Sequence, residues 1–508
     1  MLETLVPISL PPGISKLGTK YQTGSRWYDG NLVRFFSGQI MPIGGWRRVL
    51  DSSGANLAAL SGTPRKALSA RLDDGSQIVG FGTTSKFYVL AGGTLNDCTP
   101  TGFTTGAADG GYSGGAGAYG YSTYGSGLYG TGVTAATYTD ATTWQMDSFG
   151  SEGNLVFTDT TNALLYLWDG DVSHLAAVPS GAPANASAVV VTPERFLFAL
   201  NTVSTAGGTQ NARLVRWPSQ ETSTDWTPSA TNTAGEFEIA SNGRLLAGRR
   251  SQYETLLWTD CDVWAARYIG GVLLYEFVQL GDSCGLISPN ACVMMGTQGW
   301  WMGQRGFFNY NGYVQSVPCD ITDYVFGSMN TLQLAKIWAM GIPEFKEVWW
   351  FYPSASSTEI DRYVCYSYGE GHWSIGQLVR LAGSVSGATT YPIMVDSAGA
   401  VWEHEVGTFR DTLQPYVESG VFQIGNGDEI QRIQRLVPDD KTQGDVTATF
   451  FAAFYPDNDE ATYGPYSLTS PTDIRFSTRE ARVRFTGAVQ DDWRVGTPRL
   501  GILPAGRR

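Results

Sequence analysis

The stretch Tyr166-Leu-Trp-Asp-Gly-Asp-Val-Ser-His-Leu-Ala-Ala-Val-Pro179 decides the fold, and Phe308-Asn-Tyr-Asn-Gly-Tyr-Val-Gln-Ser-Val-Pro318 is a looser copy of it. Each copy runs from an aromatic strand through an Asp-Gly or Asn-Gly turn to a second short strand that ends in Val-Pro. Such turn pairs accept the positive φ of a two-residue hairpin at little steric cost. Gly170 and Gly312 are 142 residues apart, about three steps of roughly 47 residues, and propeller blades repeat every ~40–50 residues. The motif therefore predicts blades of a β-propeller.

The composition indicates the same class. The 508 residues include 62 glycines, 16 tryptophans and 25 tyrosines, and only 16% are charged, which suits many short strands joined by glycine turns. Sets of strand candidates follow one another from about residue 56, and 391–406 form a last half-set. We predict an all-β protein with a propeller of about six blades, five or seven remaining open. Residues 347–352 are nearly all apolar, which predicts a strand buried on both faces.

Three regions follow from the change in pattern along the chain. Residues 1–55 are predicted to be an N-terminal arm and platform strands, 56–407 the propeller, and 408–508 a β-sandwich with longer alternating strands. The first 50 residues carry a net charge of +4 and the last sixteen another +4, which leaves the middle at −21. Basic ends around an acidic centre predict that the two ends lie together in one platform.

Residues 106–132 hold eleven glycines and five tyrosines. This composition cannot bury enough apolar area to offset the backbone entropy of ordering, so a long loop that projects from the first blade is expected. The loop is either a flexible insertion or a tip or gate, whose tyrosines are Tyr112, Tyr119, Tyr121, Tyr124 and Tyr129.

Charge and cysteines exclude several classes of function. A net charge of −13 disfavours a general grip on nucleic acid, which needs clustered lysine and arginine. The six cysteines form no C-x-x-C pair, which argues against zinc and against a disulfide scaffold. Neither a signal peptide nor an apolar run of ~18 residues is found. We expect a protein made in a reducing cytoplasm, with no cofactor and no metal.

Candidate catalytic residues are few because the chain has three histidines. Glu403-His404-Glu405 is interpreted as a surface charge patch, and His372 and His174 as turn residues. No nucleophile motif accompanies any of them, and the chain is predicted not to be an enzyme. A glycosidase, which needs two carboxylates ~5–10 Å apart in an aromatic cleft, remains an alternative, as does a carbohydrate-binding propeller.

The segment Arg26-Trp-Tyr-Asp-Gly-Asn-Leu-Val-Arg-Phe-Phe-Ser-Gly-Gln-Ile-Met-Pro-Ile-Gly-Gly-Trp-Arg-Arg-Val49 resembles the opening of the tail tubular or nozzle proteins of short-tailed bacteriophages. In that family a tryptophan, an Asn/Val-Arg-Phe strand, a turn and Gly-Gly-Trp lead into a propeller. The resemblance implies a virion tail protein assembled in the host cytoplasm as a homo-oligomer, about six copies around a DNA channel. It also implies a phage adaptor or portal ring and tail fibres or spikes as partners.

The charge supplies a physical argument for the same role. An acidic wall repels phosphate and lets DNA slide without specific binding, while basic ends suit docking on an acidic adaptor ring. The candidate docking residues are Arg26, Arg34, Arg47, Arg48, Arg494 and Arg499. A scaffold propeller that binds cellular proteins is a further alternative.

Overall fold

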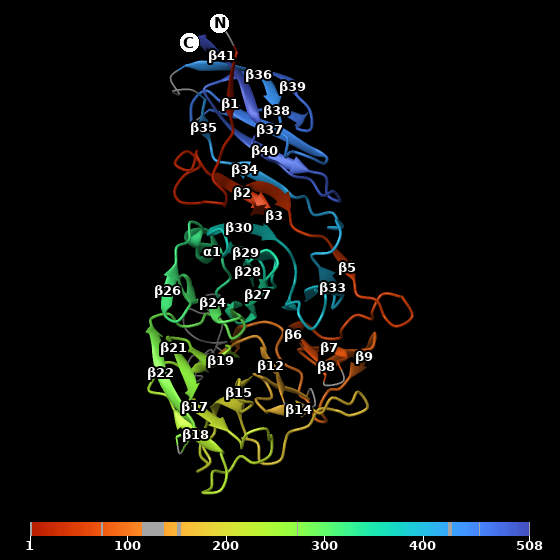
Figure 1. The fold of residues 1–508 in the computed structure, drawn as a ribbon, viewed down its shortest axis with the longest axis vertical. Helices are drawn as coiled ribbons and strands as arrows, with labels where there is room; N and C mark the ends of the chain where they lie inside the picture. The colour runs from red at the N-terminus through yellow and green to blue at the C-terminus, as the bar shows by residue number, and fades with distance from the viewer. Residues whose placement is uncertain are drawn as a thin grey trace, which may run out of the picture.

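The computed structural model describes residues 3–72, 75–113, 137–149, 154–271, 273–424, 429–456 and 458–506. The fold is nearly all-β, with 48% strand and 2% helix. Figure 1 shows a ring of sheets at one end of the long axis and a smaller group of sheets, which holds both chain ends, at the other. No helix in the described ranges is long and apolar enough to cross a membrane.

Seven antiparallel sheets of three or four strands, which we number 1 to 7 in chain order, make up the ring in the described part of the chain. Sheet 1 contains β6 Pro64–Arg71, β7 Gln77–Thr83, β8 Phe87–Ala91 and β9 Thr94–Asp97. Sheet 2 contains β12 Trp144–Phe149, β13 Asn154–Asp159 and β14 Tyr166–Trp168. Sheet 3 contains β15 Ala186–Val191, β16 Leu197–Thr202, β17 Asn211–Trp217 and β18 Gly235–Glu238. Sheet 4 contains β19 Leu245–Arg250, β20 Thr255–Thr259, β21 Asp262–Tyr268 and β22 Tyr275–Asp282. Sheet 5 contains β23 Cys292–Met295, β24 Gln298–Met302, β25 Phe307–Tyr310 and β26 Val314–Val317. Sheet 6 contains β27 Trp338–Ile342, β28 Glu347–Tyr352, β29 Arg362–Ser367 and β30 His372–Gln377. Sheet 7 contains β31 Ala382–Ser384, β32 Ile393–Val395, β33 Val401–His404 and β5 Trp46–Arg48.

The sheets close on themselves. The first strand of each sheet contacts the first strand of the next, and β31 of sheet 7 contacts β6 of sheet 1. Figure 1 shows the sheets following one another around a centre, with β30 uppermost and β15 opposite. Separate apolar clusters fill the spaces between neighbouring sheets, for example sheets 1 and 2 around Trp144 and sheets 6 and 7 around Trp349. This arrangement is a β-propeller.

The described part of the chain has seven such sheets, one more than the predicted number of about six and within the range of five to seven that the sequence left open. The half-set at 391–406 is completed on one side by β31 and on the other by β5, which pairs with β33 through Arg47↔Glu403 and His404↔Trp46. The strand β5 lies in the segment predicted to be platform. Strand β5 pairs with a strand more than 350 residues away in the sequence. Such a pairing leaves no local periodicity, so the sequence pattern showed only half of this sheet.

The repeated motif occupies the outer hairpins of sheets 2 and 5. Gly170 and Gly312 both adopt positive φ, at 88° and 83°, directly after β14 and β25 respectively. In sheet 5 the turn joins β25 to β26, and in sheet 2 a single bridge from Leu167 to Ala177 replaces the fourth strand. Sheets 2 and 5 are three steps apart, as the spacing predicted.

The second body consists of two sheets built from the first and last parts of the chain, which we call the platform. One sheet has the order β1 Thr4–Pro7, β41 Arg499–Gly506, β36 Ile430–Val437 and β39 Thr472–Thr478. The other has the order β2 Trp27–Asn31, β34 Tyr416–Ser419, β40 Glu480–Gly487, β37 Val446–Ala453 and β38 Ala461–Ser467, with β35 Phe422–Gln423 paired to β40. Phe450 of β37 and Phe476 of β39 meet across the sheets at 5.4 Å between ring centroids. The segment 430–436, which also fits a short helix, is strand.

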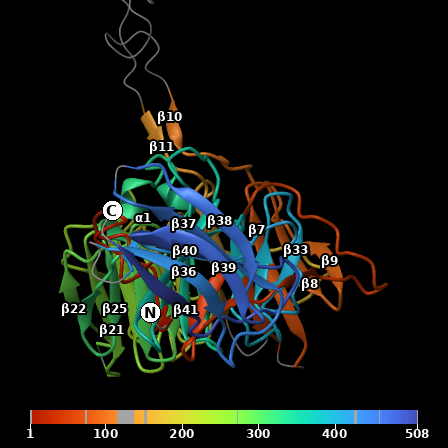
Figure 2. The same ribbon diagram turned by 90° about the horizontal axis from the view of Figure 1, so that it is seen from above.

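The platform lies at the rim of the propeller beside sheet 6 (Figure 1). Strand β2 and the hairpin of β3 Val33–Phe36 and β4 Gln39–Pro42 contact β30. All six residues of β28 are buried, which confirms that prediction. The short helices α1 Thr322–Gly327 and η1 Leu334–Lys336 join sheets 5 and 6. The strands β10 Gly111–Ser113 and β11 Thr137–Thr139 form a hairpin that projects from one face of the ring (Figure 2).

Candidate functional site

Arg34 is not available to a partner, so its prediction as a docking residue is wrong. Its side chain is 1% exposed and forms bidentate hydrogen bonds with Glu347, at 3.1 and 3.0 Å, and with Glu405, at 2.8 and 2.9 Å. Burial alone would lower the pKa of Arg34, but the two carboxylates raise it above its ordinary value. Arg34 on β3 therefore links the platform side of the chain to sheets 6 and 7.

The other five predicted docking arginines lie on different parts of the surface. Arg26 pairs with Asp320 at 3.2 Å, and Arg494 pairs with Asp492 at 3.6 Å. Arg499 is exposed on β41. Arg47 and Arg48 belong to sheet 7 of the propeller, where Arg47 pairs with Glu403 at 2.6 Å and Arg48 lies over the Trp402 ring. The structure does not gather the six arginines into one patch.

Of the five tyrosines predicted at a tip or gate, Tyr112 lies within the described residues, on β10. It is 56% exposed, and its ring meets that of Tyr138 on β11 edge to face at 5.3 Å. Tyr119, Tyr121, Tyr124 and Tyr129 lie outside the described residues.

The base of the β10–β11 hairpin is tied to the propeller by buried polar contacts. Gln333 exchanges two hydrogen bonds with the backbone of Gly110, at 2.8 and 3.0 Å. The Lys336 ammonium, with no exposed side-chain surface, donates to Asp109 at 2.6 Å and to Glu359 at 2.8 Å. Arg65 of sheet 1 completes the cluster by pairing with Glu359 at 2.7 Å. The hairpin is thus held between sheets 1 and 6.

The first strands of the seven sheets surround a central space, which we call the propeller channel. A cavity of about 960 Å³ lies beside this hairpin at the mouth of the propeller channel. Tyr112 and Tyr138 form part of its wall, and residues at or just before the starts of first strands, such as Thr143 and Pro289, form another part. Its other hydroxyl-bearing and amide side chains are Thr139, Thr160, Thr161, Ser187, Asn201, Gln304 and Thr331. The lining mixes polar and apolar side chains and bears two charged ones, Asp140 and Arg244.

A network of four side chains, which we call the channel network, crosses the channel next to this cavity. Lys66 donates to the side-chain oxygen of Asn290 at 3.1 Å, and so does Gln145 at 3.1 Å. Arg249 donates to Gln145 at 2.7 Å, and both reach the carbonyl of Pro289 in the cavity wall, at 3.3 and 3.1 Å. Burial, together with the charge of Arg249, lowers the pKa of Lys66 to about 7.

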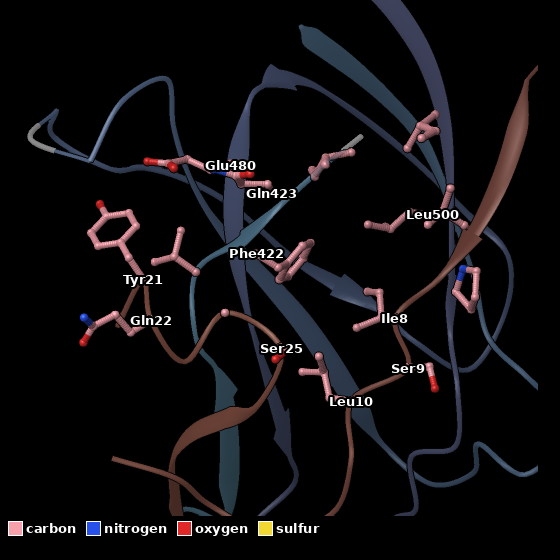
Figure 3. A pocket seen from close by; sticks show the side chains of 16 residues that line it. Ile8, Ser9, Leu10, Tyr21, Gln22, Ser25, Phe422, Gln423, Glu480 and Leu500 are labelled. Atoms are coloured by element: carbon pink, nitrogen blue, oxygen red, sulfur yellow. The ribbon is translucent and has the colours of Figure 1, made fainter. Parts of the chain in front are cut away.

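A second pocket, of about 550 Å³, opens between the platform sheets. Figure 3 shows Ile8, Leu10 and Phe422 pointing into it, with Tyr21 and Glu480 at its edge. The Glu480 side chain is buried, and its Oε1 has no hydrogen-bond partner among the described residues. Burial, and the nearby Glu460, raise the pKa of Glu480.

The histidines do not form a metal or catalytic cluster in the described chain. His404 is buried against Trp46, and its Nε2 accepts a hydrogen bond from Arg380 at 2.8 Å, so the predicted surface patch is wrong for it and for the ion-paired Glu405. His372 begins β30, where it is buried. His174 is an exposed turn residue paired with Asp169 at 2.7 Å. No group of three His, Cys, Asp or Glu suited to a metal occurs within the described ranges.

No protein-family model and no curated protein matches the chain. Among solved structures, virginiamycin B lyase from Staphylococcus aureus is similar with a TM-score of 0.41 and 7% identity, over 69% of this chain and 97% of that one. The Pan2 WD40 domain from Neurospora crassa gives 0.37 and 9%, over 72% and 96%. Exo-β-1,3-galactanase from Phanerochaete chrysosporium gives 0.28 and 12%, over 91% and 100%.

These neighbours correct the prediction that the chain is not an enzyme, because the lyase and the galactanase are enzymes. At such identities and TM-scores the likeness assigns no activity and no catalytic residue to this chain. The channel network was missed from the sequence. Lys66, Gln145 and Arg249 lie on the first strands of sheets 1, 2 and 4. Asn290 lies just before the first strand of sheet 5. A single polar residue in or near a strand carries no signal until the ring brings the first strands together.

Proposed function

We propose that the chain is a tail nozzle subunit of a short-tailed bacteriophage, of which about six copies form a ring or tube that conducts DNA. The observation that carries the proposal is the construction of the platform. Strand β1 pairs with β41, and β2 pairs with β34, so the segment that resembles the nozzle family runs from the platform into the propeller through β3, β4 and β5. We further propose that the two sheets act as a β-sandwich that docks on the adaptor ring.

The two bodies are joined in a way that suits a load transmitted along a tail. Arg34 connects β3 to Glu347 on β28 and to Glu405 beyond β33. Buried, bidentate arginine–carboxylate pairs stabilise a contact and also fix the relative orientation of the two elements that they join. A fixed angle between platform and propeller is what a repeating ring subunit requires.

The DNA path in this proposal runs between copies of the chain. The channel network of Lys66, Gln145, Arg249 and Asn290 crosses the propeller's own channel, so a duplex cannot pass along it. A central opening surrounded by several acidic subunits would repel phosphate and let the duplex slide. Docking would use the arginines that keep exposed surface outside the propeller sheets, such as Arg26, Arg494 and Arg499.

One observation favours a second function, carbohydrate binding by a receptor-binding tail part. The cavity at the channel mouth carries two tyrosines and several hydroxyl and amide groups with little charge, which is the kind of wall that stacks on and hydrogen-bonds to sugars. Glycan binding that is lost in Tyr138→Ala would support this function, and its absence across a broad glycan panel would contradict it.

The nozzle proposal is tested by mass photometry of the purified chain, alone and with the adaptor protein of the same phage. A species with the mass of about six chains, or its capture on the adaptor ring, is expected. Arg499→Glu and Arg494→Glu together should weaken capture, while Arg195→Glu, on an exposed turn of sheet 3, should not. A chain that stays monomeric with the adaptor present would contradict the proposal.

A further inference from the structure

In the part of the chain that the structure describes, two basic side chains inside the propeller have no acidic partner. Lys66 of sheet 1 and Arg249 of sheet 4 are half-buried in the channel, and among the described residues their hydrogen bonds go to amide and carbonyl oxygens only. Asp147, whose charge reaches Lys66, instead pairs with Arg250 at 3.6 Å. Within the described ranges, the channel therefore holds two basic groups without a carboxylate between them.

With both groups charged, this arrangement is costly unless an anion is present, and the lowered pKa of Lys66 reflects that cost. Cations withdrawn from water need an opposite charge or a full set of hydrogen bonds. An ammonium has three donors, and Lys66 uses one of them on Asn290 at 3.1 Å. Both basic groups hydrogen-bond to the Asn290 side-chain oxygen, Arg249 at 3.4 Å, so both lie within hydrogen-bond distance of one oxygen atom.

We propose that the propeller channel binds an anionic group, a phosphate or a carboxylate, between Lys66 and Arg249 at the channel network. Oxyanions accept charge-assisted hydrogen bonds from lysine and arginine. The cavity at the mouth gives an approach from solvent, because Pro289 lies in its wall and accepts hydrogen bonds from Gln145 and Arg249. Its hydroxyl and amide side chains would hold the uncharged part of such a ligand.

The remaining charged and titratable groups around the site do not cancel the two cations. Cys292 of sheet 5 is buried, and burial raises the pKa of its thiol, so it is neutral. Asp147 is engaged by Arg250 and by the backbone N–H of Val191 at 3.0 Å. The proposal does not depend on the tail function, because it concerns a site inside one chain.

Isothermal titration calorimetry of the full chain tests the site with inorganic phosphate and, separately, with acetate, at constant ionic strength set by sodium chloride. Saturable binding of one anion per chain is expected. Saturation by phosphate alone assigns a phosphate ligand, and saturation by acetate as well assigns a carboxylate. No saturable binding of either anion would overturn the proposal.

Variants locate the site. Lys66→Met and Arg249→Met should each weaken binding at least about tenfold, since each removes a charge-assisted contact. Arg71→Met is the matched control, because Arg71 lies on β6 with Lys66 but is exposed and hydrogen-bonds to the carbonyl of Gly75 at 3.0 Å. The affinity of this variant should equal that of the wild type. Equal affinities in all four proteins would overturn the proposal.

A measurement on the wild type removes the risk that a variant misfolds. Brief acylation with acetic anhydride at pH 7, read by peptide mass spectrometry, should modify Lys66 at least about fivefold less when phosphate is present. Lys86, an exposed lysine paired with Asp97 at 2.6 Å, should be modified equally in both conditions. Modification of Lys66 that does not change with phosphate or acetate would overturn the proposal.

Discussion

Arg34 is the residue whose loss should matter most at the junction of the two bodies. Its side chain is 1% exposed between Glu347 and Glu405, and removing one partner of a buried pair leaves the other charges unpaired, which costs about 3–5 kcal/mol. We expect Arg34→Met to lower the free energy of unfolding in urea by about that amount.

Arg47→Met is the control for that change. Arg47 also pairs with a glutamate, Glu403, but it is 61% exposed, and exposed pairs contribute about 0–1 kcal/mol. Equal losses of stability in the two variants would contradict the role given to Arg34.

Glu359 makes the polar contacts at the base of the β10–β11 hairpin sensitive to acid. Burial acts to raise the pKa of Glu359, but hydrogen bonds and charges from Arg65 and Lys336 outweigh it, so the pKa is lowered from 4.5. A carboxyl group with a lowered folded-state pKa stabilises the fold above its unfolded pKa and loses that contribution as pH falls through the folded value. The free energy of unfolding of the wild type should therefore exceed that of Glu359→Gln by a constant amount near pH 7, and this difference should shrink below about pH 4.5. A difference that grows on acidification would contradict this account.

Gly82 on β7 makes room for the neighbouring sheet. A Cβ atom at this position would lie 2.3 Å from the Trp144 ring of sheet 2, so Gly82→Ala must move a buried indole. We expect a loss of about 1–3 kcal/mol in urea unfolding, as for other overpacked cores. At Gly306 an added Cβ meets nothing within 4 Å, and Gly306→Ala should leave stability nearly unchanged. A stable Gly82→Ala protein would show that sheets 1 and 2 are not packed as described.

Turn residues were predictable at this scale, and charge partners were not. The positive φ of Gly170 and Gly312 follows from local chemistry. The partners of Arg34 lie more than 300 residues away in the sequence, so a count of charges near the N-terminus indicated a docking patch where the fold has a buried ion pair.

Strand β5 closes the ring at the scale of elements. Trp46 has no exposed surface, belongs to the apolar cluster between sheets 6 and 7, and donates its Nε1–H to Asp411 at 3.0 Å. Truncating a buried tryptophan costs about 3–5 kcal/mol. Trp46→Ala should lower stability by that amount and speed amide hydrogen exchange in β31–β33 before the other sheets.

Leu50→Ala is the control for the closing strand, because Leu50 follows β5 closely and is 53% exposed; a change within about 0.5 kcal/mol is expected. If hydrogen exchange rose equally in all seven sheets of Trp46→Ala, β5 would not be a local closure.

Elements with a complete local pattern were predictable from the sequence. Sheet 5 has four strands in 26 residues, and a glycine or asparagine turn joins each strand to the next, so its strands follow from the local sequence. Sheet 7 was seen as half a sheet, since β5 reaches it from the other end of the chain. The platform strands were recognised by their length and alternation, but their order, with β1 beside β41, depends on pairings across almost the whole sequence.

At the scale of the whole molecule, the proposed nozzle function has DNA passing beside the propeller and not through it, because the chain is acidic and the channel network crosses the propeller channel. The net charge is −13, and phosphate is repelled by such a surface. We expect the assembled protein not to retain linear duplex DNA on a filter at 150 mM salt. Retention that persists at higher salt would contradict a sliding wall.

The central claim, that copies of this chain form a ring in a phage tail, is tested most directly by negative-stain electron microscopy of the purified protein mixed with its adaptor ring. The account predicts rings or short tubes of about six elongated subunits, with one body of each subunit seated on the adaptor and an open central channel. Single particles without rings, at concentrations where the adaptor ring itself is intact, would contradict it.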